Sequence, residues 1–238
     1  MSVDVSKPGA SVPVHRVRFV DWSPSAITAL ALSPVAWTES AAAGRSVLAI
    51  GRDNGNIDLC TWCEGQSGSI AQGWSPVWTL LGEENYKIES LAFTASASHL
   101  RLFSTSGGSI VSEHFLPSSL TGQQAADTRT PTRTLSSHGG AIWSMAASPT
   151  GKFLAIGCED GVVRLIDVAG DAFEHVGTGM HVAPRMTRVA SRILSLAWGP
   201  PRRQMTTSND SDDDNDDAWH DTYLLGGLGN STAAVWDV

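Results

Sequence analysis

A six-residue pattern of apolar and small side chains recurs four times along the chain. Each copy begins with isoleucine and has leucine or methionine followed by alanine at its fourth and fifth positions; the copies lie at 27–32, 88–93, 142–147 and 193–198. The copies are too short for an amphipathic helix, and their alternation is close to the period of two of a strand. Each copy therefore predicts a β-strand, and because both of its faces are apolar we expect both to be covered.

A second apolar strand, a tight turn and a third strand follow each copy. The dipeptides at the four turns are Asn54-Gly55, Gly107-Gly108, Asp160-Gly161 and Asn230-Ser231. Such dipeptides are typical of type I′ hairpin turns, whose two central residues both have positive φ. Gly55, Gly108 and Gly161 are spaced 53 residues apart, so we expect them at equivalent turn positions.

These repeats predict an all-β, WD-repeat β-propeller with about four recognisable blades. The fourth copy ends in Trp236-Asp237, the Trp-Asp pair typical of such blades. Sheets with two apolar faces become stable by stacking radially, and small residues are needed where each wedge narrows toward the axis. We therefore expect Ala31, Ala92, Ala146 and Ala197 between neighbouring blades. The expected organisation is a flexible extension at 1–13 and a propeller at 14–238, with repeats near 24–62, 88–115, 138–168 and 192–238.

Long insertions interrupt every repeat except the third. They are expected at 35–46, 65–73, 118–136 and 200–221. Within the last, 210–217 holds six aspartates; setting these aside from the total charge of −8 leaves only −2. The segment at 201–221 is therefore interpreted as a disordered acidic insertion, with an acidic tether for a basic partner as the alternative. A calcium loop is disfavoured, because Asp217 and Tyr223 stand where such a loop needs glycine and glutamate.

The motifs of common enzymes and cofactor sites do not occur in the sequence. It has no G-x-S-x-G elbow, no glycine-rich phosphate loop and no H-E-x-x-H. Cys60 and Cys63 form a C-x-x-C without the second pair that zinc requires, so we expect no metal and no cofactor. We expect a structural role for His138, since a histidine there in WD repeats bonds the hairpin aspartate, here Asp160. No apolar run approaches the roughly 20 residues of a membrane span, so no membrane association is expected.

Arginines near both ends of the chain are candidate contacts to phosphate or to a protein partner. Arg16 and Arg18 alternate with apolar residues in a predicted strand at 14–19, and the favoured interpretation is a charged edge strand. Arg185, Arg188 and Arg192, with Arg202 and Arg203, cluster around the predicted first strand of the fourth repeat. They could form a basic rim, or the acidic insertion beside them could equally neutralise them. Phosphate or partner contact is the alternative for both groups.

Several strings of the sequence resemble one known family of WD-repeat proteins. They are Val14–Phe19, Pro24–Ile27, Arg101–Ser104, Gly139–Pro149, Gly157–Gly161 and Ser191–Trp198. Together they resemble the cirhin family of U3 small nucleolar RNA-associated proteins. The resemblance implies a non-catalytic platform of the small-subunit processome in the nucleolus, and hence in the nucleus. It implies roles in pre-rRNA processing, small-subunit rRNA maturation and rDNA transcription, with processome proteins and the U3 ribonucleoprotein as partners and no small-molecule substrate.

Members of that family are much longer and carry tandem propellers. We therefore expect an amino-terminal fragment or the product of an incomplete gene model, and in either case an incomplete propeller with an open sheet edge. The alternative function is a generic WD-repeat adaptor in another complex, such as a ubiquitin-ligase substrate receptor. A third hypothesis, a propeller enzyme with its site over the central channel, lacks converging acid and base residues in any recognisable motif.

Overall fold

The four predicted repeats form four antiparallel sheets in the computed structural model of the chain. The structure describes residues 25–34, 46–63, 73–82, 86–95, 100–116, 133–177, 186–203 and 219–238. Within these ranges the regular elements are all strands, and a short two-stranded hairpin accompanies the four sheets. In the same ranges no helix has the length and apolarity to cross a membrane.

Each of the first three sheets has four strands, in the order of the chain from one edge to the other. The first contains β1 (Ile27–Leu32), β2 (Val47–Arg52), β3 (Ile57–Cys63) and β4 (Gly73–Leu80). The second contains β5 (Ser90–Ala95), β6 (Leu100–Thr105), β7 (Ile110–Phe115) and β8 (Arg133–Ser136). The third contains β9 (Ile142–Ala147), β10 (Phe153–Cys158), β11 (Val163–Asp167) and β12 (Glu174–His175).

The fourth sheet has three described strands. They are β13 (Ile193–Trp198), β16 (Tyr223–Leu228) and β17 (Ala233–Asp237). Between β13 and β16 the chain forms the hairpin of β14 (Arg202–Arg203) and β15 (Trp219–His220). This hairpin occupies the two ends of the predicted insertion at 200–221, whose middle lies outside the described residues.

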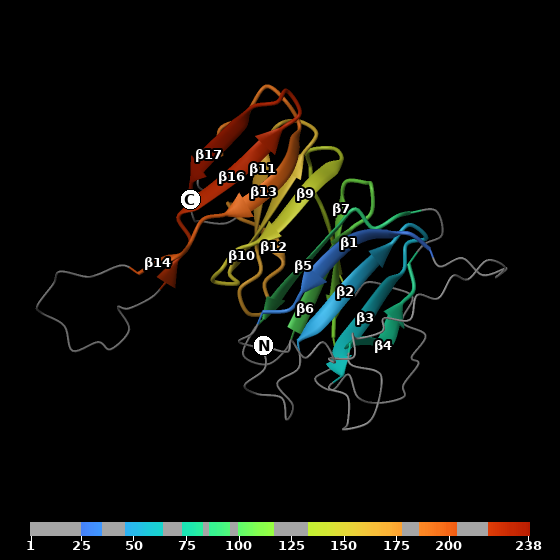
Figure 1. Cartoon of the computed structure of the whole chain (residues 1–238). Helices are drawn as coiled ribbons and strands as arrows, with labels where there is room; N and C mark the ends of the chain where they lie inside the picture. Colours follow the sequence, from blue (N-terminus) through green and yellow to red (C-terminus); the bar gives the residue numbers. More distant parts are fainter. Residues whose placement is uncertain are drawn as a thin grey trace, which may run out of the picture.

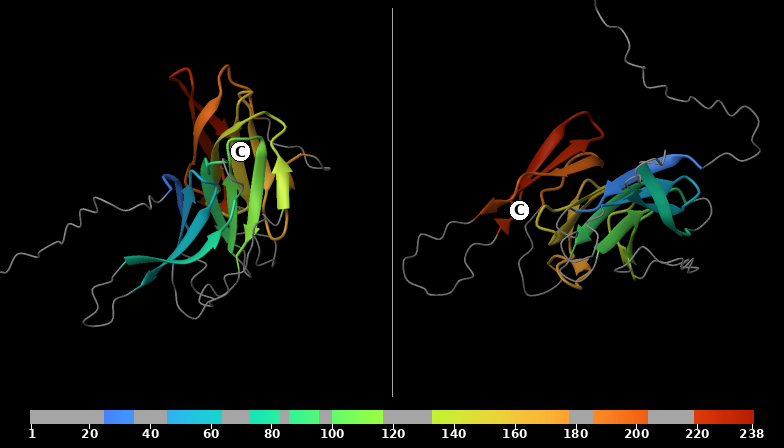
Figure 2. Two further views of the ribbon diagram at one scale, coloured as in Figure 1. Left: turned by 90° about the vertical axis from the view of Figure 1, so that its right-hand side faces the viewer. Right: turned by 60° about the horizontal axis from the view of Figure 1, so that its bottom comes forward.

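The sheets stand side by side in chain order, joined through their first strands (Figure 1). β1 contacts β5, β5 contacts β9, and β9 contacts β13. A separate cluster of buried apolar side chains fills each of the three spaces between neighbouring sheets. The first and fourth sheets lie at opposite ends of the row (Figure 2). The stacking of β-sheet repeats predicted from the sequence is thereby confirmed.

The outer strand of each of the first three sheets, β4, β8 and β12, was not predicted from the sequence. β4 begins at Gly73, the last residue of one expected insertion, and β8 lies at 133–136, inside another. These strands carry weak signals because edge strands need no continuous apolar face. β4 even contains Pro76, which a sheet tolerates at its edge because no neighbouring strand needs its missing N–H.

The hairpin turns differ from the type I′ prediction. Gly55 and Gly161 have φ of 86° and 76°, and Ser231 has 64° at the same place in the fourth sheet, but the residues before them do not have positive φ. The amide of Gly55 donates to the carbonyl of Arg52, and the amide of Arg52 donates to that of Asn56. This is a three-residue loop, a type I turn followed by one left-handed residue, in which only that residue needs glycine.

The second sheet departs further from the predicted spacing. By pairing register, Ser109 stands where Gly55 and Gly161 stand, and the left-handed residue is Gly107, with φ of 66°. The predicted equivalence of Gly108 is therefore wrong. Gly108 lies 53 residues after Gly55, but by strand register it stands one position before Ser109, the residue equivalent to Gly55.

The small residues of the repeated pattern lie between sheets in three of four cases. Ala92 is buried in the core between the second and third sheets, Ala31 packs against the first core, and Ala146 is half-buried. Ala197 is exposed, so the prediction is wrong for the fourth sheet. Its face points away from the third sheet, and no further sheet covers it within the described residues. The prediction that both faces of every sheet are covered is likewise wrong for the outer faces of the first and fourth sheets. Within the described residues no further sheet covers these two faces.

Candidate interaction surface

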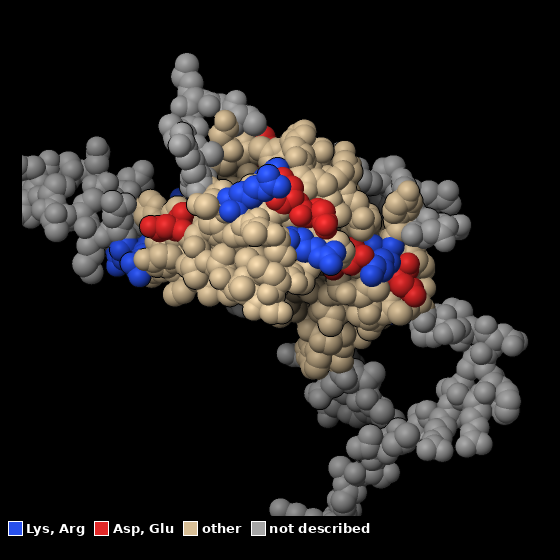
Figure 3. Space-filling view, turned by 90° about the horizontal axis from the view of Figure 1, so that it is seen from above, with Lys and Arg blue, Asp and Glu red and all other residues tan. Residues whose placement is uncertain are grey.

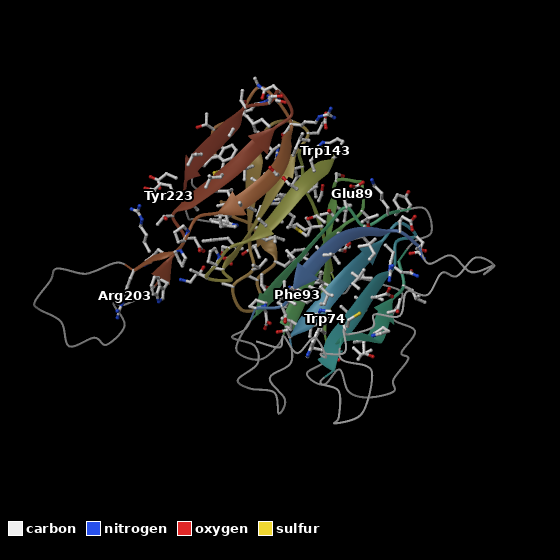
Figure 4. The ribbon with its side chains drawn as sticks, viewed as in Figure 1. Trp74, Glu89, Phe93, Trp143, Arg203 and Tyr223 are labelled. Atoms are coloured by element: carbon white, nitrogen blue, oxygen red, sulfur yellow. The ribbon has the colours of Figure 1, made fainter. Side chains whose placement is uncertain are left out.

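Charged side chains of both signs meet at the end of the sheets that carries the hairpin turns. We call this the turn-end surface and define it by Lys87, Glu89, Trp143, Glu159, Asp160, Arg164, Arg188 and Arg192. Seen from above, basic and acidic side chains lie next to one another (Figure 3). Glu89 and Trp143 both lie toward this end, whereas Trp74 lies toward the other (Figure 4). The surface is therefore of mixed charge and is not a continuous basic patch.

Asp160 is the centre of a polar network in the third sheet's turn. Its carboxylate accepts hydrogen bonds from both terminal nitrogens of Arg164, at 3.0 and 2.7 Å. This hydrogen bonding is the main reason why the pKa of Asp160 is lowered. Arg188 Nε donates to the Asp160 carbonyl at 2.9 Å, which brings the segment before β13 onto the turn. The network therefore joins the turn of the third sheet to the segment that leads into the fourth sheet.

His138 does not take the place expected for it. Arg164, rather than His138, bonds the hairpin aspartate, and the His138 carbonyl accepts a bond of 3.2 Å from the same arginine. The His138 ring instead lies 5.3 Å from the ring of His175, centroid to centroid, and its backbone has a φ of 53°. The sequence does place Arg164 four residues after Asp160, but their pairing was not predicted from this spacing.

Trp143 presents an exposed aromatic ring at the turn-end surface. The guanidinium carbon of Arg192 lies 4.8 Å from the ring centroid, and the indole N–H donates to the Glu159 carboxylate. The Trp143 side chain is 42% exposed although it belongs to β9, the strand through which the third sheet contacts its neighbours. Stacked Trp and Arg side chains can bind a nucleic-acid base or the side chain of a protein partner.

The structure brings together two of the five predicted contact residues. Arg188 and Arg192 both belong to the turn-end surface, on the segment that leads into β13. Arg16, Arg18 and Arg185 lie outside the described residues. Trp143 and Arg164 join the surface without having been predicted as contacts.

A cleft with a volume of about 340 Å³ lies between the first and second sheets. Leu80, Ile88 and Ile110 are among its apolar lining residues, and Ser104 and His114 are among the polar ones. Burial lowers the pKa of His114 to about 4, and its Nε2 lies 2.9 Å from the Ser104 hydroxyl. At neutral pH the histidine adds no charge, so the cleft suits an uncharged side chain better than a phosphate.

The cysteines and acidic residues of the described ranges do not form a reactive or metal-binding group. Cys60 and Cys158 are buried, and burial raises the pKa of both thiols. Among the residues that the structure describes, no three His, Cys, Asp or Glu side chains gather in a metal-binding arrangement. The calcium interpretation of the aspartate run concerns residues outside the described ranges.

Comparison with known proteins adds to this geometry. The family model "WD domain, G-beta repeat" matches residues 129–167. The chain is 30% identical over 226 residues to U3 small nucleolar RNA-associated protein 4 of Schizosaccharomyces pombe, covering 94% of this chain and 26% of that protein. The protein of that name in Saccharomyces cerevisiae is 33% identical over 224 residues, covering 94% and 23%. The Homo sapiens homolog is 30% identical over 187 residues, covering 79% and 22%.

The chain thus spans about a quarter of the length of these relatives. Among solved structures, it is similar to a chain of the Chaetomium thermophilum Polycomb Repressive Complex 2 bound to GSK126, with a TM-score of 0.60 and 16% identity. That alignment covers 92% of this chain and 41% of the other. At this level of identity the likeness shows the fold alone.

Proposed function

Because the chain belongs to the family of U3 small nucleolar RNA-associated protein 4, we propose that it is a non-catalytic WD-repeat scaffold of the small-subunit processome. The observation that carries this proposal is relatedness along 94% of the chain to proteins named for their association with U3 RNA. In this role the protein supports pre-rRNA processing and small-subunit rRNA maturation, coupled to rDNA transcription, in the nucleolus. Its partners are other processome proteins and the U3 ribonucleoprotein.

The geometry supports a scaffold for two reasons. Each sheet is tied to the next by its own buried cluster, so the surfaces of the row keep fixed relative positions. The turn-end surface then presents charges of both signs beside an exposed aromatic ring, a composition that suits contact with protein and RNA together.

We propose that Arg188, Arg192 and Trp143 contribute contacts to a processome partner or to RNA. A guanidinium has five N–H donors. Of the Arg188 donors, Nε bonds the Asp160 carbonyl, and the Arg192 guanidinium lies over the Trp143 ring. Exposed donors beside an aromatic face suit a phosphate next to a stacked base. For Arg16, Arg18 and Arg185 the same role remains a prediction.

The test is affinity purification of the full 238-residue chain from Saccharomyces cerevisiae cells, followed by sequencing of the bound RNA. We expect enrichment of U3 RNA and of pre-rRNA spacer sequences over an unrelated propeller with the same tag. The variant W143A/R188A/R192A should keep its fold and recover at least about tenfold less of both RNAs. Recovery of ubiquitin-ligase subunits without U3 RNA would instead support the adaptor function and overturn the processome proposal.

A further inference from the structure

The cleft between the first and second sheets has one apolar wall and one polar wall. Its apolar wall comes from the first sheet and the chain that follows it, and includes Ile57, Leu80 and Leu81. Its polar wall comes from the second sheet. Tyr86 and Ile110, which are 55% and 42% exposed, also line the cleft. Exposed large apolar side chains beside a hollow are typical of a surface that binds a partner.

A row of hydroxyl groups crosses the polar wall. Ser104 pairs with Ser112, and Ser112 pairs with Thr134, in the strand register of β6, β7 and β8. Directly opposed residues lie on the same face of a sheet, so the three side chains form a line. The first is buried, the second half-buried and the third exposed, so the row leads from the floor of the cleft to its mouth. Hydroxyl groups both donate and accept hydrogen bonds.

Both walls are held in place by contacts within the chain. The amide of Gly82 donates to the Asn56 side chain at 3.2 Å, and a side chain at Gly82 would collide with the Gly55 carbonyl. The end of the apolar wall therefore rests against the first sheet's hairpin turn. In the polar wall, His114 Nε2 lies 2.9 Å from the Ser104 hydroxyl. Preformed walls are typical of binding pockets, and the volume of about 340 Å³ lies at the lower end of their usual range, about 300–1,000 Å³.

The cleft carries no formal charge at neutral pH. None of the described residues that line it is Lys, Arg, Asp or Glu. Its histidine, His114, is neutral there because burial lowers its pKa to about 4. A phosphate or a charged side chain would lose water on entry without gaining an ionic partner, which costs free energy. The cleft therefore selects an uncharged group, in contrast to the turn-end surface.

The outer edge of β8 lies at the mouth of the cleft. In the described part of the chain β8 has β7 on one side and no strand on the other. The amide of Ser137 donates to the Ser109 carbonyl, and hydrogen-bonded pairs alternate with non-bonded pairs along an antiparallel ladder. By this alternation the backbone N–H and C=O of Thr134 point away from β7. They face the edge at which another strand can be added.

This edge differs from the faces through which the sheets stack. The sheets are joined through their first strands, whereas β8 is the outer strand of the second sheet. Both walls of the cleft already belong to neighbouring sheets of the row. A further sheet at either end of the row would therefore leave the cleft and this edge open.

We propose that the cleft binds an uncharged, extended segment of a protein partner, which pairs with Thr134 and inserts an aliphatic side chain between Leu80 and Ile110. Addition of a peptide strand to a sheet edge is a common mode of recognition, in which the backbone gives affinity and side-chain pockets give specificity. A residue paired opposite Thr134 places its side chain on the face of the hydroxyl row, and hence in the cleft. The inference goes beyond the proposed function and does not depend on it.

Selection from a phage-displayed library of random linear peptides tests the proposal on the full chain. We expect the selected peptides to share one aliphatic residue flanked by uncharged residues. I110D places a carboxylate in the cleft at a 42% exposed site, so it should fold and bind these peptides at least about tenfold more weakly. L225D, at a 46% exposed site on the fourth sheet, is the matched control and should bind as the wild type does. Failure to select any peptide, selection of charged peptides, or equal binding by I110D overturns the proposal.

Hydrogen exchange of the wild-type chain tests the strand pairing without a substitution. With a selected peptide bound, the Thr134 amide should exchange at least about tenfold more slowly, because it gains a hydrogen bond. An unchanged rate would contradict pairing at the β8 edge. A single-stranded RNA of mixed sequence should not displace the peptide, since the cleft offers no cation to its phosphates. Displacement by RNA would instead assign the cleft to a nucleobase and overturn the proposal.

Discussion

The guanidinium of Arg101 forms a fully buried ion pair with the carboxylate of Glu113, at 2.5 Å from Nε to Oε1. The other nitrogens of Arg101 donate to the carbonyls of Val168, Gly170 and Ala172, at 2.7 to 2.8 Å. These carbonyls belong to the loop between β11 and β12. One side chain therefore ties the second sheet to the third, and its charge is balanced inside the protein.

Replacing Arg101 with leucine should destabilise the protein strongly. The change leaves the buried Glu113 charge paired with the partly exposed Arg133, and it removes the Arg101 donors from three carbonyls. Removing one partner of a buried pair costs about 3–5 kcal/mol. Urea unfolding measures this loss. K87M, which breaks the exposed pair of Lys87 with Glu89, is the control and should change stability by less than about 1 kcal/mol.

Replacing Gly157 with valine should weaken the interface between the third and fourth sheets. The new side chain would meet Ile193, whose Cβ stands 2.9 Å from the added Cβ position. Overpacking of this kind costs about 1–3 kcal/mol. Thermal unfolding should show a lower midpoint for G157V and little change for G108A, where the nearest heavy atom is 4.0 Å away. Equal stability of the two variants would contradict the close approach of the sheets.

Replacing Ser231 with glycine should stabilise the fourth sheet's turn. Ser231 has a φ of 64°, which costs a residue with a side chain about 1–2 kcal/mol, partly offset by the greater unfolded-state freedom of glycine. The expected net gain is about 0.5 kcal/mol. Ser109, at the equivalent position of the second sheet, does not have positive φ, so S109G should lose about 0.5–1 kcal/mol. Denaturant unfolding of the pair tests these opposite signs.

The folded protein should lose stability in acid partly through His114. Burial lowers its pKa from 6.5 to about 4, so the fold favours the neutral ring. The resulting contribution is fully present above pH 6.5 and is lost as the pH falls toward 4. Between these values the wild type should lose up to about 3 kcal/mol more than H114Q, which cannot titrate there. Parallel pH profiles for the two proteins would show that His114 is not responsible.

The first strand of each sheet could be predicted from the sequence because neighbouring sheets cover both faces of β5 and β9 and one face of β1 and β13. That constraint leaves the same isoleucine, small residue and alanine in each repeat, as at Ile142, Ser144 and Ala146. β8, at a sheet edge, carries no such constraint and was assigned to an insertion. The repeated pattern is the same in the fourth sheet, so it could not show that Ala197 is exposed there.

The polar contacts, both in the core and at the turn-end surface, were harder to predict than the fold. Arg101 and Glu113 follow the alternation of an ordinary half-polar strand, and only the neighbouring loop reveals that both are buried. Arg164 replaces the expected histidine as partner of Asp160, because an arginine fork reaches both oxygens of the carboxylate from the next strand. Such pairings depend on how strands come together, and the pattern of residues along one strand does not show it.

Gradient sedimentation of yeast extract containing the tagged chain tests the central claim most directly, because a scaffold must travel with the particle that it organises. The wild-type chain should sediment with U3 RNA in the heavy fractions, and RNase should shift both toward the top. The destabilised R101L variant, at matched abundance, should be depleted from those fractions. A wild-type chain that remains at the top of the gradient, apart from U3 RNA, would contradict the account.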